Sequence, residues 1–203
     1  MWRKLGRSVN SWLRNSKAAA FTRRLQDLSN TYARLSVDYP FAISSLSGGS
    51  ILFCSDLTAQ FVVSRRSELD DRRLLAVSSF GFFYYGFIMK AIYIGYDLVL
   101  GPKRALVKTI LDCVVHTPFG VIPAFYFLTG VIKGQTTEQW TTQLRKEWFD
   151  ASFGSVAYWT PVQIICFRYI PQHSRIAFVS FASFFHKIWL SWLSCRNRTK
   201  HST

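Results

Sequence analysis

The residues best placed to do chemistry in this sequence are polar groups embedded in long apolar runs. Lys108, Asp112 and His116 follow one another at intervals of four within the apolar run 105–132. This spacing brings side chains onto one face of a helix. Neighbouring carboxylate and imidazole groups can relay a proton, but a single His and Asp at this spacing on a helix is too common to indicate catalysis. A line of polar groups through an apolar helix instead predicts either a polar path or a contact that locks helices together.

Other apolar runs carry isolated polar residues of the same kind. Asp56 and Gln60 are one helical turn apart in the run 40–63, Lys90 interrupts the next run, and Gln163 lies in a later one. An ionisable group at the centre of a bilayer costs ~2.5–3.5 kcal/mol, so such groups face a partner or a water-filled cavity. We expect Asp56, Gln60, Lys108, Asp112 and His116 to line a polar path, with Asp112 also pairing with Lys108. The alternative, which the sequence slightly favours, is that Lys108 lies at the membrane edge and extends its ammonium to the headgroups, while Asp56 and Asp112 only lock helices together by hydrogen bonding.

The apolar runs themselves are long enough to cross a membrane, which takes ~20 residues. The chain is 49% hydrophobic, yet it has 25 Lys and Arg against 11 Asp and Glu, a net charge of +14. The charges cluster between the runs, as in a protein that crosses a membrane several times. The runs are 40–63, 74–96, 105–132, 151–170 and 174–193.

These features predict an all-α integral membrane bundle with about four transmembrane helices. The polar segment 134–150 has Trp140, Leu144 and Trp148 at helical spacing and is expected to be an amphipathic helix along the headgroups. The two runs after this segment include a partial or interfacial helix in this interpretation, which places both termini on the same side. The expected organisation is a basic N-terminal segment (1–31), a transmembrane domain (32–195) and a basic tail (196–203).

The N-terminal segment resembles a targeting helix in composition. It is rich in arginine, contains serine, and has no acidic residue before Asp27, while Leu5, Val9, Trp12 and Leu13 are spaced as on one helical face. Such segments direct proteins to mitochondria, whereas a secretory signal needs a continuous apolar core. The alternative is a basic helix that lies on anionic lipid without being cleaved.

Several other functions lack their sequence signatures. No phosphate-binding glycine loop, nucleophile elbow or His-Glu-His metal motif occurs in the sequence, so we expect no catalysis, no cofactor and no metal. The widely spaced cysteines, Cys54, Cys113, Cys166 and Cys195, lack the spacing of a zinc site and are expected to be reduced. Direct nucleic-acid binding is not expected either, because the basic residues flank apolar runs instead of forming a recognition motif.

One series of residues in the C-terminal third forms a signature: Trp159, Pro161, Gln163, Phe167, Pro171 and Arg175. Together with Asp56 and Gln60 in the first run, and Lys108 and Asp112 in the third, this signature makes the stretch 32–193 resemble one known family. It is the family named for the Mpv protein and the twenty-two-kilodalton peroxisomal membrane protein. Lys90 departs from the pattern because it stands where the family usually has histidine, so the chain resembles a divergent member.

The signature residues also have direct physical interpretations. Pro161 removes a backbone donor and can kink a spanning helix, so Trp159 and Pro161 are expected to be structural. Gln163 is expected to act as a gate or as a contact between helices. Arg175 follows Pro171 and is expected to be an interfacial anchor or a contact for lipid headgroups.

The resemblance implies a channel-forming protein with four spans. In the mitochondrial branch of the family, it implies support of inner-membrane homeostasis and, indirectly, of mitochondrial DNA maintenance. We therefore expect a weakly selective channel for small solutes in the mitochondrial inner membrane, with a non-conducting scaffold or a peroxisomal channel as alternatives. The expected partners are the bilayer with its anionic lipids and the small solutes, and a homo-oligomer is left open.

The targeting interpretation predicts that residues 1–31 carry a reporter into mitochondria. The measurement is the location of a fluorescent protein fused after residue 31, with a control fusion in which Arg3, Arg7 and Arg14 are replaced by glutamine. We expect import of the first fusion and a cytosolic signal from the second. A first fusion that stays outside mitochondria contradicts the interpretation.

Overall fold

The computed structural model describes residues 17–63, 68–101 and 103–200, and this part of the chain contains helices and no strand. Three of the elements are π-helical sections within longer helices, and one is a short 3-10 turn. The elements are α2 (Lys17–Asp38), α3 (Pro40–Thr58), η1 (Ala59–Val63), α4 (Asp71–Ser79), η2 (Phe80–Met89), α5 (Lys90–Leu100), α6 (Ala105–Ile110), η3 (Leu111–Val121), α7 (Ile122–Ile132), α8 (Thr137–Tyr169), η4 (Gln172–Ser174) and α9 (Arg175–Lys200).

Among the described residues, three continuous helices are long and apolar enough to cross a membrane. They are Pro40–Val63, Asp71–Leu100 and Ala105–Ile132, which join α3 with η1, α4 with η2 and α5, and α6 with η3 and α7. They coincide with the first three predicted spans. The outside of the bundle carries large apolar side chains, such as Phe83, which is 58% exposed, and Phe153, which is 74% exposed. Together these observations confirm the prediction of an all-α membrane bundle.

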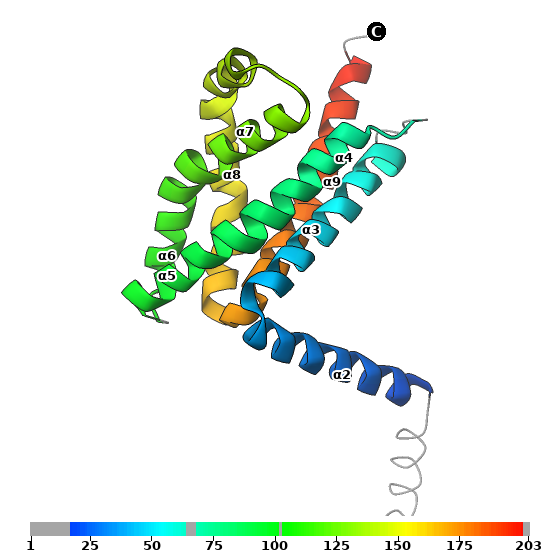
Figure 1. Ribbon diagram of the computed structural model, residues 1–203, viewed down its shortest axis with the longest axis vertical. Coiled ribbons are helices and arrows are strands. Elements are labelled where there is room, and N and C mark those ends of the chain that lie inside the picture. Colours follow the sequence, from blue (N-terminus) through cyan, green and yellow to red (C-terminus); the bar gives the residue numbers. More distant parts are fainter. Residues whose placement is uncertain (1–16, 64–67, 102, 201–203) are drawn as a thin grey trace, which may run out of the picture.

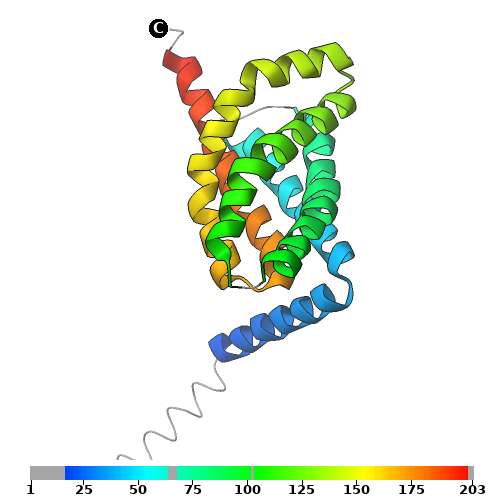
Figure 2. The ribbon, with the colours of Figure 1, turned by 90° about the vertical axis from the view of Figure 1, so that its left-hand side faces the viewer.

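Helices α8 and α9 complete the bundle as an antiparallel pair beside the three spans (Figure 1). A capping box begins α8, because Thr136 accepts from the backbone of Gln139 while the Gln139 side chain accepts from the backbone of Thr136. The first part of α8 lies across one end of the bundle, and the helix then turns to run along it (Figure 2). This first part is the amphipathic helix expected at 134–150.

The course of α9 corrects one expectation about topology. Helix α9 has 26 residues and returns along the whole bundle, so its last turn lies at the opposite end from α2 (Figure 1). The expectation that both termini lie on one side assumed that one of the two last apolar runs was only partial. Both runs instead form long helices, and the described ends of the chain therefore lie at opposite ends of the bundle.

Small residues bring α3 and η2 into direct backbone contact. A Cβ atom on Gly86 would lie 2.0 Å from Cα of Ser45, and one on Gly81 would lie 2.5 Å from the carbonyl oxygen of Gly48. Helices in a membrane gain no hydrophobic stabilisation from each other, so close packing of this kind holds them together. Glycine at these positions is therefore what allows the two helices to touch.

A tryptophan in α8 stabilises the π-helical section η3. The N–H of Ile122 donates to the carbonyl of Thr117, five residues earlier. In this pattern the N–H of residue 123 would donate to the carbonyl of Pro118. Residue 123 is a proline and has no N–H, so the backbone leaves this carbonyl without a donor. Trp148 Nε1 donates to that carbonyl at 2.8 Å instead. The amphipathic part of α8 is therefore attached to the third span by a polar contact where the backbone lacks a donor.

The close contact of α3 with η2 predicts different effects of two Gly→Ala changes in the same long helix. Gly86→Ala forces the two backbones apart and should cost at least about 1–3 kcal/mol. Gly95→Ala is the control, because a Cβ atom there meets no atom within 4 Å. Thermal unfolding in detergent should show a lower midpoint for Gly86→Ala and an unchanged or higher one for Gly95→Ala. Equal midpoints would contradict the assigned packing.

Candidate functional site

Asp112 is the centre of a hydrogen-bonded cluster in the middle of the bundle. Its Oδ1 lies 2.8 Å from His116 Nδ1, and its Oδ2 accepts from Gln163 Nε2 at 2.6 Å. Tyr84 Oη lies 3.0 Å from His116 Nε2, and Tyr93 Oη lies 2.6 Å from Gln163 Nε2. We call Asp112, His116, Gln163, Tyr84 and Tyr93 the Asp112 cluster. An ionised carboxylate only accepts hydrogen bonds, so a neutral His116 would donate from Nδ1 and accept from Tyr84 at Nε2.

A second cluster lies at the end of the bundle where α5 ends and α6 and α9 begin. Asp97 accepts from Lys108 Nζ, and its Oδ2 lies 2.8 Å from Arg175 Nη1. Arg175 also donates from Nε to the carbonyl of Ile170 at 3.2 Å and lies over the ring of Phe167. We call Asp97, Lys108 and Arg175 the Asp97 cluster.

The Asp97 cluster corrects two expectations. Lys108 was expected to pair with Asp112, one turn away on the same helix, but its ammonium contacts Asp97 on another helix. Arg175 was expected to be an interfacial anchor, but it is only 5% exposed and forms an internal ion pair. In both cases a cation in an apolar interior pairs with the carboxylate that the tertiary structure brings closest, because isolated burial of a charge is costly.

The third cluster lies at the other end of the bundle. Asp56 accepts from Gln60 at 2.8 Å, from Arg73 Nε at 3.0 Å and from Lys187 Nζ at 3.3 Å. Gln60 Oε1 in turn accepts from the backbone N–H of Asp70 at 2.8 Å. We call Asp56, Gln60, Arg73 and Lys187 the Asp56 cluster. It connects the end of the first span with the start of the second and with α9.

Helix α9 joins the clusters into one interior feature. Arg175, Ser183 and Lys187 lie on one face of α9 because they are separated by multiples of four residues. Arg175 reaches the Asp97 cluster and Lys187 the Asp56 cluster, while Ser183 Oγ donates to Tyr85 Oη at 3.3 Å between them. We call the three clusters together with the Tyr85–Ser183 pair the polar column.

The candidate residues chosen from the sequence are all buried. They are Asp56, Gln60, Lys90, Lys108, Asp112, His116 and Gln163. Lys90 does not join a cluster of the column, because its Nζ donates to the carbonyl of Gln172 at 3.0 Å. Sequence reasoning missed Asp97, Arg73, Tyr84 and Tyr93. Asp97 follows Tyr93 at an interval of four, the spacing that identified the other polar stripes, and this signal could have found it.

The signature residues divide between the core and the surface. Phe167 is buried and packs against Tyr93 with ring centroids 4.9 Å apart. Trp159 is buried beside the His186 ring, whereas Pro161 and Pro171 are exposed. In the part of the chain that the structure describes, no group of three or more His, Cys, Asp or Glu residues is arranged to hold a metal.

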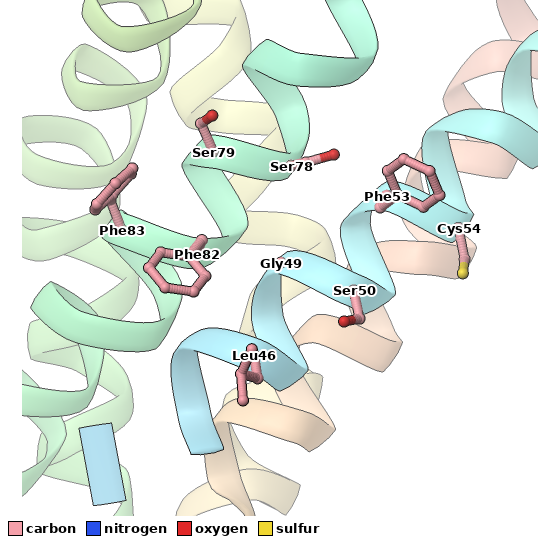
Figure 3. Close-up of a pocket in the computed structure, with 9 residues that line it drawn as sticks. All are labelled: Leu46, Gly49, Ser50, Phe53, Cys54, Ser78, Ser79, Phe82 and Phe83. Carbon is pink, nitrogen blue, oxygen red and sulfur yellow. The ribbon is translucent and has the colours of Figure 1, made fainter. Parts of the chain in front are cut away.

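A surface groove lies outside the polar column, between α3 and the α4–η2 helix. Its volume is about 560 Å³, and Figure 3 shows its lining side chains on these two facing helices. The exposed rings of Phe53, Phe82 and Phe83 take part in the lining. In a membrane these rings face the lipid, so this groove belongs to the outer surface of the bundle.

Helices with an apolar exterior and paired charges in the interior define the class of this protein, an α-helical integral membrane bundle. A profile of the Mpv17 / PMP22 family matches residues 130–191. The mitochondrial inner membrane protein Mpv17 of Danio rerio is 31% identical over 170 residues, which cover 81% of this chain and 96% of that protein. The chain belongs to the Mpv17 / PMP22 family.

More distant relatives come from two membranes. The mitochondrial inner membrane protein Mpv17 of Homo sapiens is 27% identical over 174 residues, covering 83% of this chain and 98% of that protein. Peroxisomal membrane protein 2 of Bos taurus is 23% identical over 172 residues, covering 80% of this chain and 86% of that protein. These names match the expected mitochondrial address and its peroxisomal alternative. No solved structure matches the chain.

The Asp97 cluster predicts a large loss of stability when its carboxylate is removed. Asp97→Ala leaves Lys108 and Arg175 buried without their acidic partner, which should cost about 3–5 kcal/mol. Asp150→Ala removes an exposed carboxylate from α8 and is the control. The measurement is the thermal unfolding midpoint of both variants in detergent. The assigned ion pairs would be contradicted if the two variants unfolded at the same temperature.

Proposed function

We propose that this protein is a weakly selective channel for small solutes and that the solute path follows the polar column. The observation that carries the proposal is the extent of the column. Polar and charged groups follow one another through the bundle interior, from the Asp97 cluster through the Asp112 cluster to the Asp56 cluster. Ionisable groups inside a membrane are costly and usually serve an ion or solute pathway. A bundle that only needed stability would gain more from apolar packing.

The column is closed in this conformation, because its groups are paired with each other. Asp56 and Asp112 are at most 1% exposed, and Lys108 is fully buried. Conduction therefore requires a second conformation in which water enters between the helices. Polar groups that already line the interior would lower the cost of that entry, since water can replace each of their hydrogen bonds.

Helix α9 is the element whose displacement would open the column. Its side of the column consists of polar contacts, namely Arg175 with Asp97, Ser183 with Tyr85, and Lys187 with Asp56. The contact between α3 and η2, in contrast, consists of glycine backbones in direct contact. Water can replace the partners of hydrogen bonds and ion pairs, whereas it cannot replace the contacts that two closely packed backbones lose when they separate. We therefore assign the moving part to α9 and the fixed part to the first two spans.

The proposed location is the mitochondrial inner membrane. Relatives that carry this location in their names align with most of the chain, and the N-terminal sequence has the composition of a mitochondrial targeting segment. A peroxisomal membrane is the alternative, since a more distant relative is a peroxisomal membrane protein. A contribution to mitochondrial DNA maintenance would be indirect, through the solutes or the membrane.

A non-conducting scaffold is the second candidate function. The observation that favours it is the hydrogen bonding of the carboxylates, because Asp56, Asp97 and Asp112 each have two or more polar partners on other residues. Carboxylates satisfied in this way can hold helices together without any path. The scaffold thus requires the column to stay dry, whereas the channel requires it to open.

The channel proposal predicts that Asp112→Asn changes conduction without loss of the protein. Asparagine keeps the size of the side chain but removes one negative charge from the middle of the path, so ion preference should shift toward anions. The measurement is single-channel current and reversal potential in planar bilayers under a salt gradient. Asp150→Asn, at an exposed position of α8, is the matched control and should behave like the wild type.

Two results would contradict the channel. One is a silent bilayer with wild-type protein whose folding is verified by circular dichroism, and this result favours the scaffold. The other is a folded Asp112→Asn protein with unchanged conductance and ion preference, which removes the path from the Asp112 cluster. Misfolding and degradation of Asp112→Asn alone would indicate that Asp112 locks helices together.

A further inference from the structure

A second groove lies where the third span begins and α8 ends, and it differs from the groove between α3 and η2 in its charge. Two adjoining cavities of about 380 and 420 Å³ share Lys103, Ala105 and Arg168 in their linings. Arg104 completes the basic part, and no acidic residue lines either cavity. We call this groove, with Lys103, Arg104 and Arg168 at its rim, the basic groove.

The cations of the basic groove differ from those of the polar column. Lys108 and Arg175 are buried and paired with Asp97. Lys103, Arg104 and Arg168, in contrast, are exposed, and within the described part of the chain none of them forms an ion pair with an acid. The positive charge at the rim is therefore not neutralised by the protein. An anionic group is the partner that fits it.

The rest of the groove is apolar and faces away from the bundle. Its walls include Leu106 and Val107, which are 65% and 42% exposed, together with Ile164. Leu106 and Val107 belong to the first turn of a helix of 28 residues. At ~1.5 Å per residue that helix is roughly 40 Å long, which exceeds a hydrocarbon core of ~30 Å. Its first turn therefore lies where headgroups meet acyl chains.

Helix α2 supports this assignment of the membrane surface. It lies across the same end of the bundle, next to the connection between α8 and α9 (Figures 1 and 2). Phe21, Leu25 and Leu28 are spaced along one face and are 64%, 50% and 66% exposed. A helix with an exposed apolar face at the end of spanning helices is typical of one embedded in the headgroup boundary.

We propose that the basic groove binds one anionic phospholipid. Its headgroup phosphate lies between Lys103, Arg104 and Arg168, and an acyl chain lies along Leu106, Val107 and Ile164. Basic pockets between membrane helices recognise such headgroups by charge-assisted hydrogen bonds. Three cations without an acid disfavour a headgroup that carries its own positive charge, so a net-negative lipid is selected over phosphatidylcholine. The site is independent of solute conduction.

The test is native mass spectrometry of the full-length protein in detergent, titrated with cardiolipin or with phosphatidylcholine. We expect one cardiolipin to remain bound under conditions that remove phosphatidylcholine. The triple variant K103Q/R104Q/R168Q should lose at least tenfold in affinity for cardiolipin. The triple variant K133Q/R145Q/K146Q removes the same charge from exposed residues near the other end of the bundle and should bind as the wild type.

Further measurements separate a lipid site from a simple anion site and from a folding defect. Inorganic phosphate at the same concentration should leave the thermal unfolding midpoint unchanged, whereas cardiolipin should raise it for the wild type. Ile164→Trp fills the apolar wall without changing the charge and should also weaken cardiolipin binding. The proposal is overturned if K103Q/R104Q/R168Q, folded by circular dichroism, binds cardiolipin like the wild type, or if phosphate alone reproduces the stabilisation.

Discussion

The structure depends on the cost of holding a charged carboxylate away from water. Asp56, Asp97 and Asp112 each lie in or beside a long apolar helix, where an unpaired charge would be strongly destabilising. Each of them therefore gathers partners from other helices. These partners determine which helices lie together, since α9 pairs with the second span through Asp97 and with the first span through Asp56. The same carboxylates that make the interior polar thus make the bundle specific.

The membrane reverses the usual distribution of side chains, and two kinds of contact follow from this. Between α3 and η2, where no polar group is needed, Gly48, Gly81 and Gly86 allow the backbones to touch, so dispersion acts over a short distance. Between α9 and the spans, hydrogen bonds and ion pairs stand beside the apolar packing of Ile176 and Val179. The polar groups of the column thus lie on the α9 side of the bundle, and this asymmetry underlies the proposed movement of α9.

The polar column and the basic groove use cations for different purposes. Lys108 and Arg175 are turned inward and neutralise Asp97, whereas Lys103, Arg104 and Arg168 lie a few residues away and remain at the surface. The end of the bundle that holds the Asp97 cluster is therefore also the end that presents unpaired positive charge at the surface. A lipid bound there would contact α6 and α8 on their outer side, whereas the Asp97 cluster lies inside the bundle.

The class of this protein can be predicted from its residues alone, because long apolar runs, glycines and isolated polar residues constrain local structure directly. The first three spans, the amphipathic start of α8, and the shared face of Asp56 with Gln60 and of Asp112 with His116 follow from spacing alone. The pairing of the charges and the course of α9, in contrast, became known only from the packed helices. A side chain four residues away on the same helix is always a candidate partner, but a carboxylate on a neighbouring helix can lie closer. Such contacts depend on how whole helices pack, which local spacing does not encode.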